Sequence, residues 1–339
     1  MIGQPDLLTI RPNLKATVTM DPLSEVLRAV RLTGGVFLSA HFTAPWCISV
    51  AITPDDCARY LPKRPAQMIG YHVVTEGKLL VGIESAPMLE VSAGEIVLFP
   101  QNNSHTLANE RGIKPVSARS LIQRSPDGGL SRIDHGGGGA ETRIVCGFLA
   151  SEENYNPLIS TLPKALKIDV RQGASREWIE ASVRFAAGEL TNGRLASSNV
   201  MTRLSESLLT EAVRQYSSSL PENELGWLKG LNDSHVGRAL ALIHHKLTEP
   251  WSAEALASEV ALSRSAFVQR FTSFVGMPPI RYLTVMRLQA ARLNLRETSK
   301  TIVQIAHSVG YESGEAFSRA FKREYGQSPA QWRDEQSKA

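Results

Sequence analysis

Cysteine is scarce in this chain. The 339 residues include three cysteines, Cys47, Cys57 and Cys146, and no two of them have the CxxC spacing of a metal knuckle or a redox pair. An odd number of widely spaced cysteines argues against a disulfide framework and against a zinc finger. The sequence therefore fits a reducing compartment.

Long apolar runs are also missing. The first residues lack the basic stretch and apolar stretch of a secretory signal. No segment approaches the roughly 18 apolar residues that cross a bilayer. We therefore expect a cytoplasmic protein with no membrane span. The sequence contains neither a P-loop nor a Ser/His/Asp pattern, so these motifs point to no class of enzyme.

The net charge is small, at +4, but it is unevenly distributed. Residues 231–339 carry 14 Lys and Arg against 10 Asp and Glu, whereas residues 1–230 carry 23 of each kind. Hydrophobic residues make up 42% of the chain, which is typical of a globular protein, and the length suits two or three domains. A basic excess confined to the last third is what a phosphate-facing surface needs.

The first half has the rhythm of short β-strands. Seven apolar segments, from VFLSAHF after Gly34 to TRIVCGFL, are separated by Gly, Pro and Asn. This spacing predicts an antiparallel sandwich or barrel, preceded by a short amphipathic helix at residues 21–32. Residues 123–141, rich in Gly, Ser and Asp, are expected to form a mobile loop between strands.

One segment of this region carries a specific pattern. Gly94, Pro100, His105 and Asn109 match four of the five anchors in the second motif of the cupin superfamily. Asn102 stands at the fifth anchor, where the motif has glycine, and Asn tolerates a positive φ. Residues 1–172 therefore resemble a cupin-type sensor barrel.

The metal ligands of the cupin family are only partly present. The His-x-His pair of the first motif is missing, and the glutamate position falls on Gly70. His72 lies two residues later, so it should point into the barrel, and His105 occupies a ligand position of the family. With Cys146 these imidazoles would suit a zinc ion that keeps one open position. Alternatively, His72 and His105 line a ligand pocket and Cys146 is a small buried apolar residue.

Residues 173–220 have helical periodicity. Apolar residues that include Leu204 and Leu208 recur every three or four positions and form a continuous stripe. The stripe either packs on the barrel or pairs two chains about a two-fold axis. We expect a helical dimerisation region here, running into the start of a linker, and a homodimer.

Residues 231–336 contain one short pattern twice. The second copy follows the first at an offset of 49 residues before a turn and 50 after it, in the pairs Leu256 and Ile305, Phe267 and Phe317, Phe271 and Phe321, Gly276 and Gly326, and Pro279 and Pro329. A repeat of this length is one supersecondary unit used twice. Each copy has two short helices that begin at a Ser or Thr cap and meet at a tight turn, which predicts a helix-turn-helix.

A longer helix is expected between the copies. About 18 residues at a rise of 1.5 Å give about 27 Å, which would place the second helices of the two copies in successive major grooves. The aromatic residues of these second helices should face inward. The outward residues are then Arg264, Ser265, Val268, Gln269 and Thr272 in the first copy, and Gly314, Glu315, Ser318, Arg319 and Lys322 in the second.

The last hundred residues, ending in GYESGEAFSRAFKREYGQSPAQWR, are similar to the DNA-binding domain of AraC/XylS-family transcription regulators. The resemblance implies that Ser265, Val268 and Gln269, and then Gly314, Glu315, Ser318 and Arg319, read bases or lie beside residues that do. Arg, Gln and Glu can bind guanine, adenine and cytosine respectively. We expect the second copy to supply much of the discrimination. Candidates for phosphate contacts, with a solvated helix face as the alternative, are Arg264, Arg281, Lys322 and Arg323.

The expected function is sequence-specific, ligand-responsive regulation of transcription rather than catalysis. The expected partners are double-stranded DNA, a small-molecule effector and RNA polymerase. Two alternatives stay open at this point. The chain is either a metal-dependent cupin oxygenase or isomerase tethered to DNA, or a DNA-binding protein whose barrel serves only to pair chains.

Overall fold

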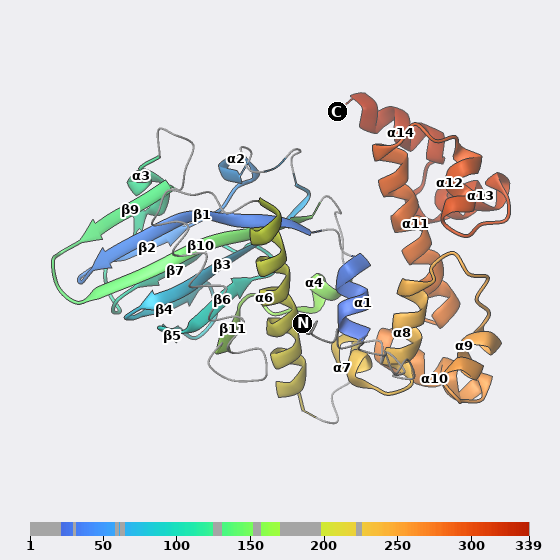
Figure 1. Cartoon of the computed structure of the whole chain (residues 1–339), viewed down its shortest axis with the longest axis horizontal. Coiled ribbons are helices and arrows are strands. Elements are labelled where there is room, and N and C mark those ends of the chain that lie inside the picture. The colour runs from blue at the N-terminus through green and yellow to red at the C-terminus, as the bar shows by residue number, and fades with distance from the viewer. Residues whose placement is uncertain are drawn as a thin grey trace, which may run out of the picture.

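The computed structural model describes residues 22–29, 32–57, 61, 65–124, 131–151, 157–169, 198–221 and 226–338. A strand-rich N-terminal part is followed by helices only, so the chain is a mixed α+β protein (Figure 1). The elements of the first part are α1 (Pro22–Ala29), β1 (Leu32–Thr43), β2 (Cys47–Val50), α2 (Pro54–Cys57), β3 (Gln67–Glu76), β4 (Lys78–Ile83), β5 (Leu89–Ser92), β6 (Glu95–Phe99), β7 (His105–Ala108), β8 (Val116–Ser117), α3 (Ala118–Leu121), β9 (Ser131–Gly136), β10 (Glu141–Ser151), α4 (Pro157–Thr161), β11 (Leu166–Asp169) and α6 (Ser198–Ser219).

The strands form two sheets that face one another. Their orders are β11-β6-β3-β10-β1-β9 and β5-β4-β7-β2-β8. Alternate residues of both sheets point into a shared apolar core, with Phe42 and Phe148 from the first sheet and Val81 and Leu107 from the second. Among the described residues no ladder joins the sheets, so the expected barrel is corrected to two facing sheets. The edge strand β8, with two residues, is too short to close the side.

The glycine-rich segment is more ordered than expected. Residues 131–136 form β9, which pairs in parallel with β1, whereas residues 125–130 lie outside the described part of the chain. A Cβ atom on Gly136, whose φ is +142°, would lie 1.8 Å from the carbonyl oxygen of Thr43. The prediction of a mobile loop over 131–136 was wrong because glycine here permits close backbone packing.

Helix α6 crosses the outer face of the six-stranded sheet (Figure 1). Tyr71 of β3 points towards it, with its hydroxyl 2.9 Å from Ser205 Oγ. The apolar stripe is buried within the chain itself, through Leu208, Leu209, Ala212 and Val213. Leu208 therefore packs inside the molecule, as the first of the two alternatives for this stripe predicts. The side chain of Leu204 lies outside the described part.

The C-terminal part is entirely helical over residues 226–338. Every Ser or Thr cap predicted for the repeat is present, including the reciprocal hydrogen bonds of Thr301 and Gln304. The structure adds Gly276 and Gly326, which end two helices in the left-handed conformation. The helices are α7 (Trp227–Asn232), α8 (Val236–His245), α9 (Ala253–Glu259), α10 (Arg264–Val275), α11 (Pro279–Glu297), α12 (Ile302–Ser308), α13 (Gly314–Tyr325) and α14 (Pro329–Lys338).

The turns of the two copies correspond as well. Ala261 and Gly310 occupy the same position of the repeat, and both have a positive φ, of 54° and 85°. In each turn a backbone amide bonds back to the first helix, from Leu262 to Ala257 and from Tyr311 to Ala306. The repeat in the sequence is therefore a repeat in the structure, with α9 and α10 as one helix pair and α12 and α13 as the other.

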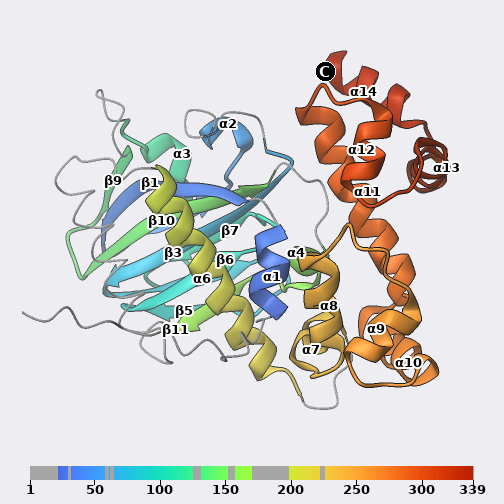
Figure 2. The ribbon, with the colours of Figure 1, turned by 45° about the vertical axis from the view of Figure 1, so that its right-hand side comes forward.

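The two helix pairs have different neighbours. The first pair and α7, α8 and the start of α11 share one buried core with α1, α4, α6 and the outer face of the six-stranded sheet. In Figures 1 and 2, α1 lies against α8 between the sheets and the helices. The second pair packs with α14 and the end of α11 around a separate core. Only the first pair is part of the core that supports the sheet.

Candidate nucleic-acid interface and ligand cavity

The outer face of α10 is accessible along its length. Phe267 and Phe271 are fully buried, which turns Arg264, Ser265 and Gln269 outward, while Val268 and Thr272 are half-buried. With Ser273, the five predicted residues line a groove on this face. Arg264 already forms an ion pair within the protein, because its Nε lies 2.6 Å from Glu254 Oε1 of α9.

The outer face of α13 is more cationic. Phe317 and Phe321 point inward, and Glu315, Arg319, Lys322 and Arg323 are exposed. The three basic side chains make no ion pair with any carboxylate in the described part of the chain. They are therefore available to an anionic partner.

Three of the residues predicted to contact DNA also have partners within the protein. Arg281 is paired with Glu324 at 2.6 Å and so ties α11 to α13. A Cβ atom on Gly314 would lie 3.1 Å from Val303 Cγ2, so this glycine allows α12 and α13 to approach closely. The backbone amide of Glu315 and the hydroxyl of Ser313 lower the pKa of the Glu315 carboxyl, with a smaller contribution from Arg319.

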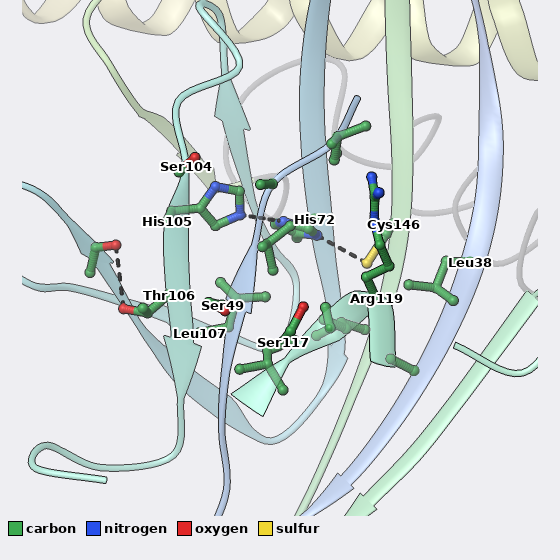
Figure 3. A pocket seen from close by; sticks show the side chains of 18 of the residues that line it. Leu38, Ser49, His72, Ser104, His105, Thr106, Leu107, Ser117, Arg119 and Cys146 are labelled. Carbon is green, nitrogen blue, oxygen red and sulfur yellow. Dashed lines mark hydrogen bonds between the residues drawn. The ribbon is translucent and has the colours of Figure 1, made fainter. Parts of the chain in front are cut away.

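A cavity of about 880 Å³ lies between the two sheets. His72 of β3, His105 of β7 and Cys146 of β10 meet at one end of it, as Figure 3 shows. His72 and Cys146 are directly opposite each other in the antiparallel pairing of β3 with β10. The structure thus brings together the three side chains proposed from the sequence.

These three side chains form a chain of hydrogen bonds. His72 Nδ1 lies 3.0 Å from Cys146 Sγ, and His72 Nε2 lies 2.8 Å from His105 Nε2. His105 Nδ1 lies 2.9 Å from the carbonyl oxygen of Asn103, which can only accept. His105 must therefore donate from Nδ1 and accept at Nε2, His72 must donate from Nε2, and the Cys146 thiol must donate to His72 Nδ1.

Burial favours the neutral form of each member. It lowers the pKa of His105 to about 4, against the opposing hydrogen bond to Asn103. It also lowers the pKa of His72, with help from His105, and raises the pKa of the Cys146 thiol. At neutral pH the chain of hydrogen bonds carries no charge.

This arrangement does not fit the zinc site considered from the sequence. A zinc ion needs its ligand atoms to converge at about 2.0 to 2.3 Å from one point. Here His72 lies between the other two and bonds to each through a different ring nitrogen. Over the described residues no group of three His, Cys, Asp or Glu side chains is placed to hold a metal ion.

The mouth of the cavity carries an ion pair that the sequence did not reveal. Arg119 of α3 lies 2.7 Å from Asp56 of α2, and both line the cavity. Burial of Asp56 opposes its ionisation, but hydrogen bonds from Thr53 and Arg119 outweigh this and lower the pKa of the carboxyl. The Thr53-Pro-Asp-Asp start of a helix was the available signal for Asp56. Arg119 had none, because its partner is 63 residues away.

Comparison with known proteins agrees with this architecture. A family model described as a cupin matches residues 21–218, which is more than half of the chain. The chain belongs to this cupin family. A model described as a helix-turn-helix domain matches residues 256–335. The match covers both helix pairs apart from the first residues of α9.

The similar curated proteins are named as regulators. A putative AraC-like transcription regulator of Streptomyces antibioticus is 28% identical, over 93% of this chain and 98% of its own length. The HTH-type transcriptional regulator AlkR of Acinetobacter baylyi is 27% identical, over 93% of this chain and 100% of its own. With the two matched domains, these relatives place the chain among AraC-type transcription regulators with a cupin domain.

Among solved structures, an AraC-type regulator from Chromobacterium violaceum is 31% identical, with a TM-score of 0.29 and coverage of 30% of this chain and 92% of that one. The DNA-binding domain of AdpA, solved with a target DNA, is 29% identical, with a TM-score of 0.29 and coverage of 30% and 91%. No helix among the described residues is long and apolar enough to span a membrane.

Proposed function

We propose that this AraC-type regulator reads a specific DNA sequence with α10 and α13, and that a small molecule between the sheets controls its placement. In this proposal each helix pair is a helix-turn-helix. The observation that carries the proposal is the equivalence of Gln269 and Arg319. They occupy the same position of the repeat and are both exposed on the outer face of the second helix.

The spacing of the two pairs supports simultaneous binding. Helix α11 has 19 residues. At a rise of 1.5 Å this gives about 28 Å between its ends, close to the roughly 34 Å that separates successive major grooves on one side of DNA. Gln269 suits adenine and Arg319 suits guanine, while Lys322 and Arg323 suit phosphates. RNA polymerase at the bound promoter completes the set of proposed partners.

Control by a small molecule needs a physical connection between cavity and DNA. The core that α1, α6, α7 and α8 share with the sheet supplies it, because α10 packs on that same core. The effector must prefer one arrangement of these elements, since equal affinity for both would shift nothing. The metal-dependent enzyme considered from the sequence loses its ligand set, because His72, His105 and Cys146 do not converge.

Selection from genomic DNA tests the proposal. Fragments retained by the full chain are sequenced, and a shared sequence with two conserved clusters about 10 base pairs apart is expected. A chain in which Gln269 and Arg319 are both replaced by Ala is the matched control, and the fragments that it retains should have lost the preference at the base pairs read by these two residues. The proposal would be contradicted if the fragments retained by the parent chain shared no sequence.

A further inference from the structure

The wall of the cavity is mainly hydrocarbon. Strands of both sheets and helix α3 contribute aliphatic side chains, with Leu38 and Ile144 from one sheet and Ile48, Val50 and Leu107 from the other. A cavity of about 880 Å³ falls in the size range that encloses most of a drug-sized molecule. Most of any ligand held here would therefore touch aliphatic carbon.

The charges on the described lining do not favour an anion. Arg119 is the one described cation of the lining, and its guanidinium is paired with Asp56. Glu84 at the rim adds a second carboxylate, so the described lining has one negative charge in excess. An anion that binds Arg119 would have to compete with Asp56 for its guanidinium.

The polar end of the cavity is satisfied without a ligand. The Cys146 thiol, His72 and His105 each donate to the next member, and Asn103 accepts at the end. The ring of His105 is also stacked on Phe99, with centroids 3.6 Å apart. A ligand that hydrogen-bonds to His72, His105 or Cys146 would have to break this chain and leave a buried group unpaired.

We propose that the effector is a neutral, largely apolar molecule, which contacts the aliphatic wall and leaves the Cys146–His72–His105 chain intact. This inference rests on the proposed function, because it names the class of effector that the regulator would sense. Three observations support it together: the aliphatic lining, the ion pair that already engages Arg119, and the hydrogen bonds that satisfy Cys146, His72 and His105.

Two fluorescent probes of matched shape test the class. 1-Anilinonaphthalene is neutral, and 8-anilinonaphthalene-1-sulfonate is the same framework with one anionic group. Titrated into the full chain at neutral pH, the neutral probe should bind saturably with one site per chain. The sulfonate should bind at least about tenfold more weakly, because its charge finds no free partner.

Cavity-filling variants locate the bound probe. Ala40→Phe on β1 and Ala118→Phe on α3 each place a ring in the cavity, because both alanines line it. Both should abolish probe binding while circular dichroism shows that the fold is kept. His41→Phe is the matched control, because His41 is the next residue on β1, points away from the cavity and does not line it. If one filling variant fails to fold, the other still decides the result.

Three results would overturn the inference: tighter or equal binding of the sulfonate, no saturable binding of the neutral probe, or equal binding by both filling variants and His41→Phe. Genomic fragments retained by the same protein are sequenced in parallel. A chain that recovers a specific DNA sequence but does not bind the neutral probe disproves the class of effector alone. A chain that recovers no specific sequence disproves the proposed function, whatever the probes do.

Discussion

At the scale of single residues, one backbone carbonyl determines the protonation of the cavity. Because the Asn103 oxygen only accepts, the positions of all hydrogens on His105, His72 and Cys146 follow from it. The sequence identified the three side chains but not their order. Their order depends on the register of β3 against β10, which places His72 beside Cys146 and leaves His105 on its far side.

The stability of the chain should fall in mild acid because of His105. Its pKa is about 4 when folded and about 6.5 when unfolded, so between these values the unfolded chain binds more protons. Stability is therefore fully present above about pH 6.5 and is lost as the pH falls towards 4. Between pH 7.5 and 5.0 this group contributes a loss of up to about 2 kcal/mol.

Urea unfolding at the two pH values measures this loss. His105→Asn should show a smaller loss than the parent. Some loss of stability remains in the variant, because burial also lowers the pKa of His72 and brings that of His244 to about 4. Equal losses in parent and variant would contradict the neutral, buried state assigned to His105.

Two basic residues on α13 should have different effects on DNA binding. Arg319→Ala should remove the preference at one base pair, worth about 1 to 3 kcal/mol, because Arg319 occupies the reading position. Lys322→Ala should weaken all sequences alike and reduce the salt slope by about 0.9, as expected for one phosphate contact. Binding curves for a set of single-base variants at several salt concentrations measure both effects. The assignment is wrong if Arg319→Ala keeps every preference of the parent.

At the scale of elements, the sequence predicted the helices better than the strands. Helix caps and the position of Asn102 at a φ of 50° depend on neighbouring residues, and both were correctly predicted. The strand β9 was missed because its partner β1 is about 90 residues earlier in the chain. The sequence did not decide what covers the apolar stripe of α6, because the residues of a strand do not show which element packs on the outer face of its sheet.

Gly147 of β10 shows how tightly α6 is fitted to the sheet. A Cβ atom on Gly147 would lie 2.1 Å from Tyr71 Oη, and the Tyr71 ring is buried beneath α6. Gly147→Ala should therefore cost about 1 to 3 kcal/mol through overpacking. Gly35→Ala on the adjacent strand is the matched control, because nothing lies within 4 Å of its added Cβ. Thermal unfolding of the two variants compares them, and equal stability would contradict the fitted contact.

At the scale of the whole molecule, the two helix pairs depend on different cores. The first pair shares its core with the sheet, whereas the second pair has its own. Helix α1 is one of the links, because its Leu23 and Val26 are buried in the shared core. Its Glu25 lies 3.3 Å from His245 of α8. A ligand between the sheets can therefore act on α10 more directly than on α13.

Hydrogen exchange tests this division. Leu23→Ala combined with Val26→Ala should increase amide exchange in α8 and α10 and leave α12 to α14 unchanged. Leu295→Ala, in the core of the second pair, should increase amide exchange in α12 to α14 and leave α8 and α10 unchanged. Equal exchange in both pairs for both variants would show that the helices form one cooperative unit.

The most direct test of the account is a base-by-base affinity profile of the full chain on the DNA site that it selects. We predict two clusters of discriminating base pairs about 10 apart, with one base-pair preference lost from the stronger cluster in Arg319→Ala and one lost from the weaker cluster in Gln269→Ala. A profile with a single cluster, or one unchanged by both substitutions, would contradict the claim that the repeated helix pairs read DNA together.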